Sequence, residues 1–355
     1  MKEHSYIGFL GLAVAVVVVI SFFPSCREKT SISNQIVVTA MGIDQNESGV
    51  TLTVQAVEAL KTSASLSEQS QAATGVYRAS GPSIHYALQG FLNETGRSTY
   101  ILHNQLIVIG EKTVKEHSLY DTLDFFLRNL ESRALVDVII CRNNPKTVLE
   151  LQSENDAIPA EYVAQMLKEG QRLGVAVKAR LLDVQQTAGG QYDMVAPIIN
   201  VADKTPHLEG TAVLHQGYVV GELTQEETTS FLYAANEIDT CLHSKNGVTL
   251  RVSSSSTRLS FETDGKCHIQ ITGRVEITES EKTLTQEIKG EYVKAFEEEL
   301  ERRVKAVMEK VTNEYKSDPL ALVRRAQHAS KRLDLQEARF TVTANMQLTE
   351  SGFTT

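Results

Sequence analysis

LTQEIKGEYVKAFEEELERRVKAVMEKVTNEY, residues 284–315, decides the fold of the second half of this chain. Its large apolar side chains recur every three or four residues and form one stripe, made of Tyr292, Phe296, Leu300, Val304, Val307, Met308, Val311 and Tyr315. Lys, Glu and Arg occupy the opposite face. This spacing predicts a long amphipathic helix that packs on a neighbouring sheet, and a coiled-coil partner is the alternative.

Alternating strands surround this predicted helix. Apolar and polar residues alternate over 248–252, 258–262 and 268–277, and again from Phe340 to Leu348. Alternation requires one face on a core and one face in water, as in an antiparallel sheet. A hairpin over 210–221 and a helix beginning at Thr224 precede these strands. We therefore expect an open sheet with the long helix lying across it.

The first half alternates strands with helices. The expected strands are 36–44, 50–56, 106–109 and 135–141, and the expected helices are one after Ser83 and others at 119–132, 160–173 and 175–186. This order predicts a mixed sheet covered by helices on one face. Asp124 and Arg128 are spaced for an i,i+4 ion pair. The polar stretch 61–74 has little to bury and is expected to be a mobile loop.

The predicted fold class is therefore α+β and multidomain, with mixed and antiparallel sheets each covered by helices and a long C-terminal amphipathic helix packed on an open sheet. The polar, proline-containing join at 203–207 is the expected domain boundary. It divides the chain into a leader (1–25), an N-terminal α+β region (26–202) and a C-terminal α+β domain (203–355).

The leader decides the compartment. Residues 7–23 carry no charge. Cys26 stands three positions after this run and is preceded by the small Ser25. This arrangement is similar to a bacterial lipoprotein signal, in which Cys26 would become the lipidated first residue. An uncleaved membrane anchor and a buried core helix are the alternatives. Either of the first two tethers the chain to a membrane outside the cytoplasm.

Composition argues against nucleic acid as a partner. The formal net charge is -9, and the sequence has no long basic run with which to bind phosphates. Cys141, Cys241 and Cys267 are read as small buried hydrophobes, although a disulfide between the last two stays open.

No enzyme motif appears. The chain lacks a Gly-rich phosphate loop, a nucleophile elbow and a His-Glu-x-x-His motif, and its nine histidines do not share metal-binding spacing. Glu226 and Glu227 are adjacent on a predicted helix, so they point to different sides and cannot flank one substrate bond. The acidic run 297–299 with Glu301 is interpreted as a solvated face. We predict a protein that is not an enzyme and has no metal or cofactor.

Four motifs in order carry a resemblance. After Cys26 come IVVTAMGID (36–44), HNQLIVIGE (103–111), LDFFLRNLESR (123–133) and GELTQEE (221–227). In order and spacing they resemble the Ger(x)C family, the lipid-anchored C subunits of spore germinant receptors. The resemblance covers nearly the whole chain after the leader, including YKSD at 315–318.

The resemblance implies a multidomain α+β protein without enzymatic activity on the outer face of the spore inner membrane. It would be lipid-anchored at Cys26 and work beside two integral membrane subunits of the A and B type in the response to nutrient germinants. Asp44, Arg128, Arg133 and Glu227 are candidates for the partner interface, and each could instead be structural. A solute-binding lipoprotein is the rival function.

Overall fold

The computed structural model describes residues 35–57, 74–129, 132–151, 158–188, 193–263, 265–280 and 285–349. The predicted leader with Cys26, and the predicted loop as far as residue 73, lie outside these ranges. Ile36–Thr355 form one compact unit, and all three hydrophobic cores described below belong to it.

The first half is built on a nine-stranded sheet. Its strands are β1 (Gln35–Asn46), β2 (Gly49–Val57), β3 (Thr74–Gly81), β4 (Ser98–Tyr100), β5 (Leu106–Gly110), β6 (Asp137–Cys141), β7 (Met194–Ala202), β8 (Thr205–His215) and β9 (Tyr218–Leu223). The order is β3-β2-β1-β5-β6-β7-β8-β9, with β4 beside β1. The pairs β1-β5, β5-β6 and β6-β7 are parallel, and the pairs β3-β2, β2-β1, β7-β8 and β8-β9 are antiparallel.

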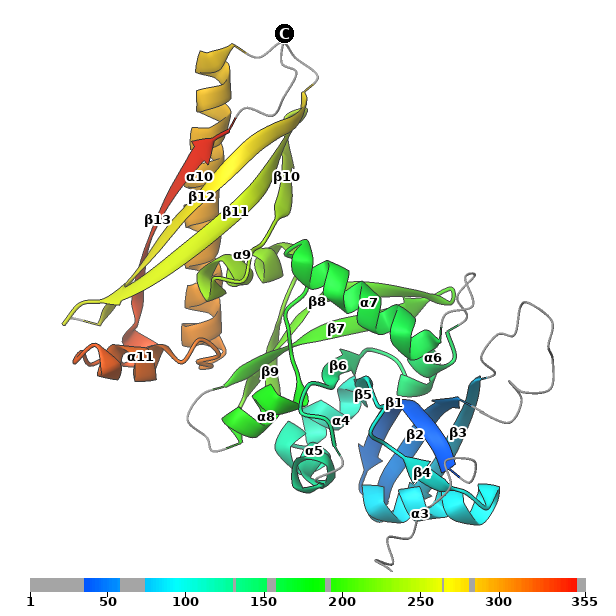
Figure 1. Ribbon diagram of the computed structural model, residues 1–355. Helices are drawn as coiled ribbons and strands as arrows, with labels where there is room; N and C mark the ends of the chain where they lie inside the picture. Colours follow the sequence, from blue (N-terminus) through cyan, green and yellow to red (C-terminus); the bar gives the residue numbers. More distant parts are fainter. Residues whose placement is uncertain are drawn as a thin grey trace, which may run out of the picture. The chain divides into compact units, whose positions relative to one another are not determined.

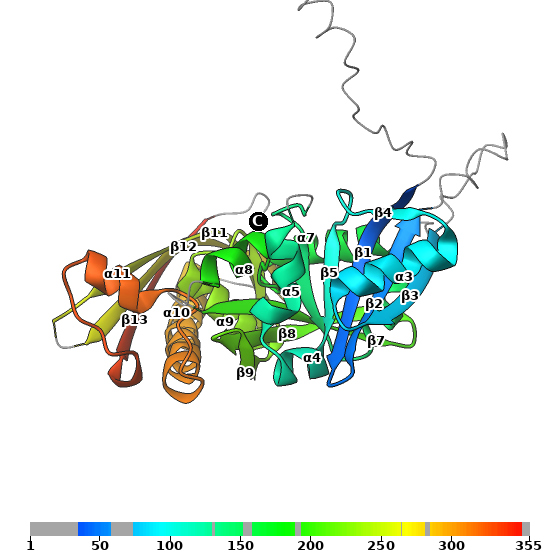
Figure 2. The same ribbon diagram turned by 90° about the horizontal axis from the view of Figure 1, so that it is seen from below.

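Helices cover both faces of this sheet, so the prediction of one covered face was wrong (Figures 1 and 2). The first core lies under α3 (Ile84–Thr95), α5 (Leu119–Arg128) and α8 (Leu181–Thr187). The core on the other face lies under α6 (Pro145–Leu149) and α7 (Pro159–Arg172). Strand β5 explains this, because its consecutive Ile107 and Val108 are both fully buried and point to opposite faces.

One predicted helix boundary changed. The expected helix at 175–186 begins only at Leu181, because Gly174 ends α7 with a φ of 67° and Arg180 instead bridges Asp137 of β6. A further short helix, α4 (Glu111–Glu116), follows β5 directly. The expected domain join falls at the turn between β7 and β8, where Asp203 and Lys204 have positive φ and the sheet continues on both sides.

The second half is a four-stranded sheet. It comprises β10 (Cys241–Lys245), β11 (Val248–Phe261), β12 (Lys266–Ser280) and β13 (Arg339–Leu348), in that order. The predicted strands 248–252 and 258–262 are one strand, β11, with a register shift between Val252 and Ser254. The last strand is parallel to β12, because the chain returns through α10 before entering β13.

The long helix lies where its stripe predicts. Helix α10 (Gln286–Glu309) continues as a π-helical turn, Lys310–Glu314, and buries Phe296, Leu300 and Val304 in the third core. That core also takes in α9 (Gln225–Ala235) and α11 (Leu322–His328). The packing on a sheet is therefore confirmed.

The acidic run of α10 is not simply a solvated face. Glu301 accepts a hydrogen bond from the backbone N–H of Ala344 (2.8 Å), and Glu297 accepts one from Met346 (2.6 Å). Glu299 is only 10% exposed and pairs with Arg303 at 2.5 Å. Glu297 and Glu301 therefore occupy backbone N–H groups of β13, which is an edge strand. Without them, these N–H groups could pair with a strand of another chain.

Candidate functional site

The four residues proposed for the partner interface lie in four different places. Asp44 is near the end of β1, Arg128 ends α5, Arg133 follows that helix, and Glu227 lies in the first turn of α9. Asp44 and Glu227 have neighbours inside the protein, whereas Arg128 and Arg133 are exposed. The structure therefore does not bring the four together into one surface.

Asp44 is half-buried against the end of β5. A Cβ added to Gly110 would overlap its Oδ1, and its Oδ2 is buried with no hydrogen-bond partner among the described residues. Burial raises the pKa of the Asp44 carboxyl, and Arg78 partly opposes this rise. Gly42, two residues earlier, lies inside β1 and packs against Pro145 of α6. This part of the first motif therefore serves close packing at the carboxyl edge of the sheet.

Glu227 is engaged twice within the chain. Thr224 and Glu227 form a capping box at the start of α9, and Lys310 donates to Glu227 Oε1 at 2.8 Å. Burial alone would raise the pKa of Glu227, but the hydrogen bonds from Lys310 and Thr224 outweigh it and lower the pKa. The structure thus gives Glu227 a role in fixing α9 to the end of α10.

The GELTQEE motif forms the joint between the two sheets. A Cβ on Gly221 would overlap the ring of Tyr315, so only glycine lets this ring lie on β9. The carbonyl of Glu222 accepts hydrogen bonds from Lys310 (3.2 Å) and from the Tyr315 hydroxyl (3.1 Å). Leu223 is buried in the third core. This short motif therefore holds Lys310 and Tyr315, which follow it by almost a hundred positions in the chain.

A second set of contacts completes this joint after the π-helical turn. Asp318 donates its backbone N–H to Asp193 Oδ2 at 2.9 Å, and the same Asp193 oxygen lies 2.9 Å from His215 Nδ1. Ser317 donates to the carbonyl of Leu214 on β8. The YKSD segment therefore links the end of the long helix to β8 and to Asp193 before β7, and sequence spacing alone did not reveal this.

Arg142, at the end of β6, is the centre of an ion cluster that the sequence analysis missed. Its guanidinium binds Glu222 (2.5 Å), Glu111 (2.7 Å) and Glu209 (3.0 Å). The Arg142 hydrogen bond holds the pKa of Glu222 below its ordinary value, although burial opposes it. No pattern in the sequence links these residues, because they come from β6, β9, α4 and β8 and meet only when the sheet forms.

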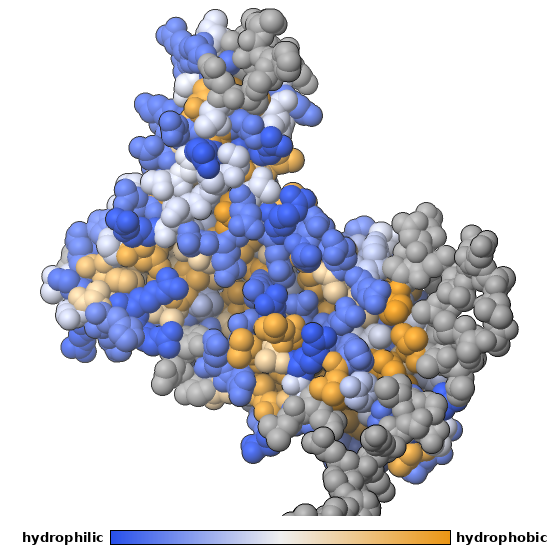
Figure 3. Space-filling view, viewed as in Figure 1, coloured by the Kyte–Doolittle hydropathy of each residue, from blue (hydrophilic) through white to orange (hydrophobic). Residues whose placement is uncertain are grey.

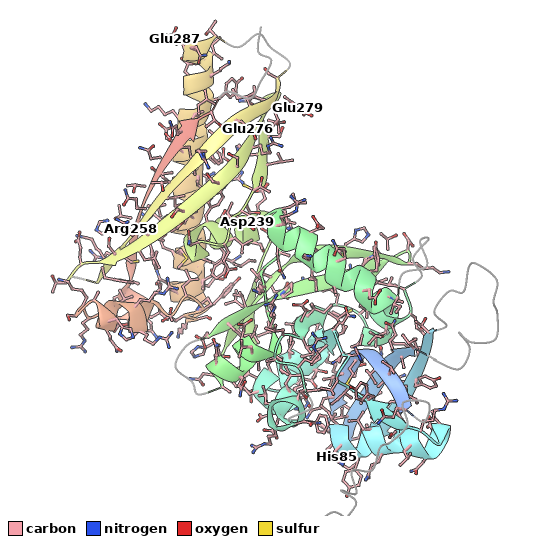
Figure 4. All side chains as sticks on the ribbon, in the orientation of Figure 1. His85, Asp239, Arg258, Glu276, Glu279 and Glu287 are labelled. Carbon is pink, nitrogen blue, oxygen red and sulfur yellow. The ribbon has the colours of Figure 1, made fainter. Side chains whose placement is uncertain are left out.

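A groove between α3 and α5 contains Arg128 and has a volume of about 790 Å³. Its apolar wall includes Leu88, Leu92 and Phe125, and the ring of His85 lies edge-on to Phe125 at 5.9 Å. Leu92 is 47% exposed. Figure 4 labels His85 on α3, and Figure 3 shows separate hydrophobic patches on a largely hydrophilic face.

Arg128 lies at the rim of this groove. It binds both carboxylate oxygens of Asp124 at 2.8 Å, which confirms the predicted ion pair. The carboxylate raises the pKa of this exposed guanidinium. The groove therefore offers an apolar floor with a charged rim, which is the arrangement of many protein interfaces.

Cys141, Cys241 and Cys267 are buried free thiols, so the disulfide left open above is not formed. Within the described ranges, His, Cys, Asp and Glu form no group that could hold a metal ion. The helices in the same ranges include none with the length and apolar character needed to cross a membrane.

Two family models match nearly all of the chain. The spore germination protein N-terminal domain matches residues 28–201, and the spore germination B3/GerAC-like C-terminal domain matches residues 209–352. Spore germination protein KC of Bacillus subtilis (strain 168) is 24% identical over 281 residues, which are 70% of this chain and 69% of that protein. Spore germination protein B3 of the same organism is 24% identical over 241 residues, 63% of this chain and 64% of the relative.

A solved structure has the same fold. The crystal structure of the GerBC protein aligns with a TM-score of 0.55 and 17% identity, and covers 87% of this chain and 96% of its own. At this identity the likeness concerns the fold, whereas the two family models cover both halves of the sequence. The chain therefore belongs to the Ger(x)C family of spore germination proteins.

Proposed function

We propose that this protein is the lipid-anchored C subunit of a nutrient germinant receptor. It would be held at Cys26 on the outer face of the spore inner membrane and act by contact with two integral membrane subunits, without catalysing a reaction. The match of both family models carries this proposal. Lipid tethering would raise the effective concentration of the body near its partners, so a modest interface would suffice.

Within this proposal, the groove between α3 and α5 is the surface that meets a partner subunit. It combines the exposed Leu92 with the charged rim at Arg128, whose ion pair with Asp124 is solvent-exposed, whereas Glu227 is bound to Lys310. Arg is among the residues that carry most of the affinity of many protein interfaces. Glu227 and Asp44 would then support the fold.

Co-purification from spore membranes tests this assignment. The change Leu92→Asp puts a charge on the groove without disturbing a core and should lower recovery of the A and B type subunits by about tenfold. Leu173→Asp is the matched control, because Leu173 is 39% exposed at the end of α7, outside the groove. Equal recovery with both variants would reject the groove as the interface.

The anchor is tested separately by mass spectrometry of the N-terminus of membrane-extracted protein. Lipid on Cys26 as the first residue is the expected result, and an intact leader would indicate an uncleaved anchor. Calorimetric titration of the body alone with amino acids and sugars should give no heat of binding. Tight binding there would instead favour a solute-binding protein.

A further inference from the structure

The segment from Lys316 to Arg332 is the most basic part of the described structure. It contains five cations, Lys316, Arg324, Arg325, Lys331 and Arg332. Its one acidic residue, Asp318, is buried and accepts hydrogen bonds from the backbone of Leu322 and Val323. A strongly positive segment thus stands in a chain whose formal net charge is -9.

Packing turns these cations outward. Leu322 and Ala326 bury one side of α11 in the third core, and this leaves Arg324 and Arg325 exposed. Arg325, Lys331 and Arg332 form no salt bridge with any carboxylate that the structure describes, although Arg325 lies near enough to the buried Asp318 to oppose the rise in its pKa that burial causes. Arg142 and Arg303, in contrast, bind carboxylates.

Further cations lie at the same end of the four-stranded sheet. Arg339, the first residue of β13, is exposed and stands in register with Lys266 of β12. Figure 1 shows α11 at the end of the sheet where β11 turns into β12, and Figure 4 labels the exposed Arg258 on this sheet. We call the five cations of 316–332 with Arg258 and Arg339 the basic end.

We propose that the basic end docks on the anionic phospholipid headgroups of the membrane to which the body is tethered. This rests on the proposed function, which supplies the membrane. Clusters of four to eight Lys and Arg residues bind anionic lipid surfaces by electrostatic attraction. The rest of the body is acidic and repelled by such a surface, so this end would set the orientation of the body.

The surface chemistry favours lipid over a protein partner. Protein interfaces take most of their affinity from a few Trp, Tyr and Arg side chains that are packed in desolvated pockets. Among the described residues, the last large exposed hydrophobic side chain in the sequence is Leu242, so none belongs to the basic end. The basic end therefore offers charge without an apolar anchor, which suits a layer of charged headgroups.

Vesicle sedimentation tests the proposal with residues 36–355, which hold all three cores and the whole compact unit. This body should bind phosphatidylcholine vesicles only when they contain phosphatidylglycerol, and rising salt should release it. The triple change Arg325→Gln, Lys331→Gln and Arg332→Gln should weaken binding about a hundredfold, or about fivefold per cation.

The control carries the same change of charge elsewhere. Lys294→Gln, Arg302→Gln and Lys305→Gln remove three exposed cations from α10 and should leave vesicle binding unchanged. Equal weakening by both triple variants, binding to pure phosphatidylcholine, or no binding by the unaltered body would overturn the proposal. So would loss of membrane subunits, with vesicle binding intact, in the first triple variant alone, since the cations would then face a protein. Lipid alone is present in this test, so it can fail while the co-purification test succeeds.

Discussion

The two sheets of this protein are covered differently. The nine-stranded sheet has helices on both faces, whereas the four-stranded sheet has α10 on one face and water on the other. Strand β5 is accordingly buried at every residue, and β12 alternates, with Ile271 buried and Thr272 exposed. The number of covered faces thus sets the residue pattern of a strand.

Their polar contacts differ as well. The first sheet gathers three carboxylates around the guanidinium of Arg142, while the second presents carboxylates of α10 to the backbone of the edge strand β13. In one case side-chain charges join several strands, and in the other they occupy the donors of one strand.

Removing the cation of the first sheet should have the largest effect. Arg142→Met leaves Glu111, Glu209 and Glu222 close together without their shared counter-charge. We expect a loss of about 3 kcal/mol in unfolding free energy at pH 7, at the lower limit for a broken buried pair because Arg142 is 28% exposed. Urea denaturation measures it, with the exposed Arg172→Met on α7 as a control that should change little.

The pH dependence sharpens this test. The lowered pKa of Glu222 means that its contribution to stability is present above the pKa of the unfolded state and is lost as the pH falls through the folded pKa. In Arg142→Met the carboxylates repel one another, so their pKa values should rise above the unfolded values and acidification should relieve the repulsion. The gap between the two proteins should therefore be smaller at pH 4 than at pH 7, and a constant gap would contradict the cluster.

A single buried hydroxyl tests whether both faces of β5 are covered. Val108→Thr keeps the shape of a fully buried side chain in β5 but buries a hydroxyl, and it should lower the unfolding free energy by about 2 kcal/mol. The adjacent Ile107→Thr should also destabilise. On β12 we expect a loss for Ile271→Thr but none for Thr272→Val. Tolerance of Val108→Thr would mean that one face of β5 is not sealed.

A smaller effect is expected at the edge of the second sheet. Glu301→Ala removes the acceptor for the N–H of Ala344 and should cost about 1 kcal/mol, while Glu301→Gln keeps a carbonyl acceptor and should cost less. The control is Glu298→Ala, at an exposed position on α10. Glu297→Ala combined with Glu301→Ala should also promote self-association on gel filtration. If the double variant stayed monomeric and were as stable as Glu298→Ala, the two carboxylates would not protect the edge strand.

The smallest change in stability is expected for Arg128→Ala, at the end of α5. Its ion pair with Asp124 is solvent-exposed, and pairs of this kind contribute little. The thermal midpoint of this variant should equal that of the control Arg172→Ala. Recovery of the membrane subunits should fall only for Arg128→Ala if the groove is the interface. A clear loss of thermal stability would make Arg128 a structural residue.

Sequence patterns were informative where a feature depends on near neighbours. The stripe of 284–315 predicted α10 and its packing, Asp124 and Arg128 were paired correctly, and Thr224 begins α9 as expected. These follow from the 3.6-residue period and from local capping, which involve few residues and short separations. The order of four motifs was enough to identify the family.

Distant contacts could not be obtained in this way. Nothing local tells that Gly221 must admit the ring of Tyr315, that Asp318 reaches Asp193, or that Arg142 collects three carboxylates. The roles of Asp44 and Glu227 inside the fold were equally hidden, because a charged residue has the same sequence pattern at a partner surface and in an internal ion pair.

The sequence by itself therefore determined the long amphipathic helix, most of the longer strands, the fold class and the family, because each rests on periodicity or on the order of short motifs. Only the tertiary structure decided which faces are covered, that β13 runs parallel to β12, and where exposed cations gather. The physical reason is that these properties depend on residues far apart in the chain, whose meeting is fixed by the packing of the whole unit.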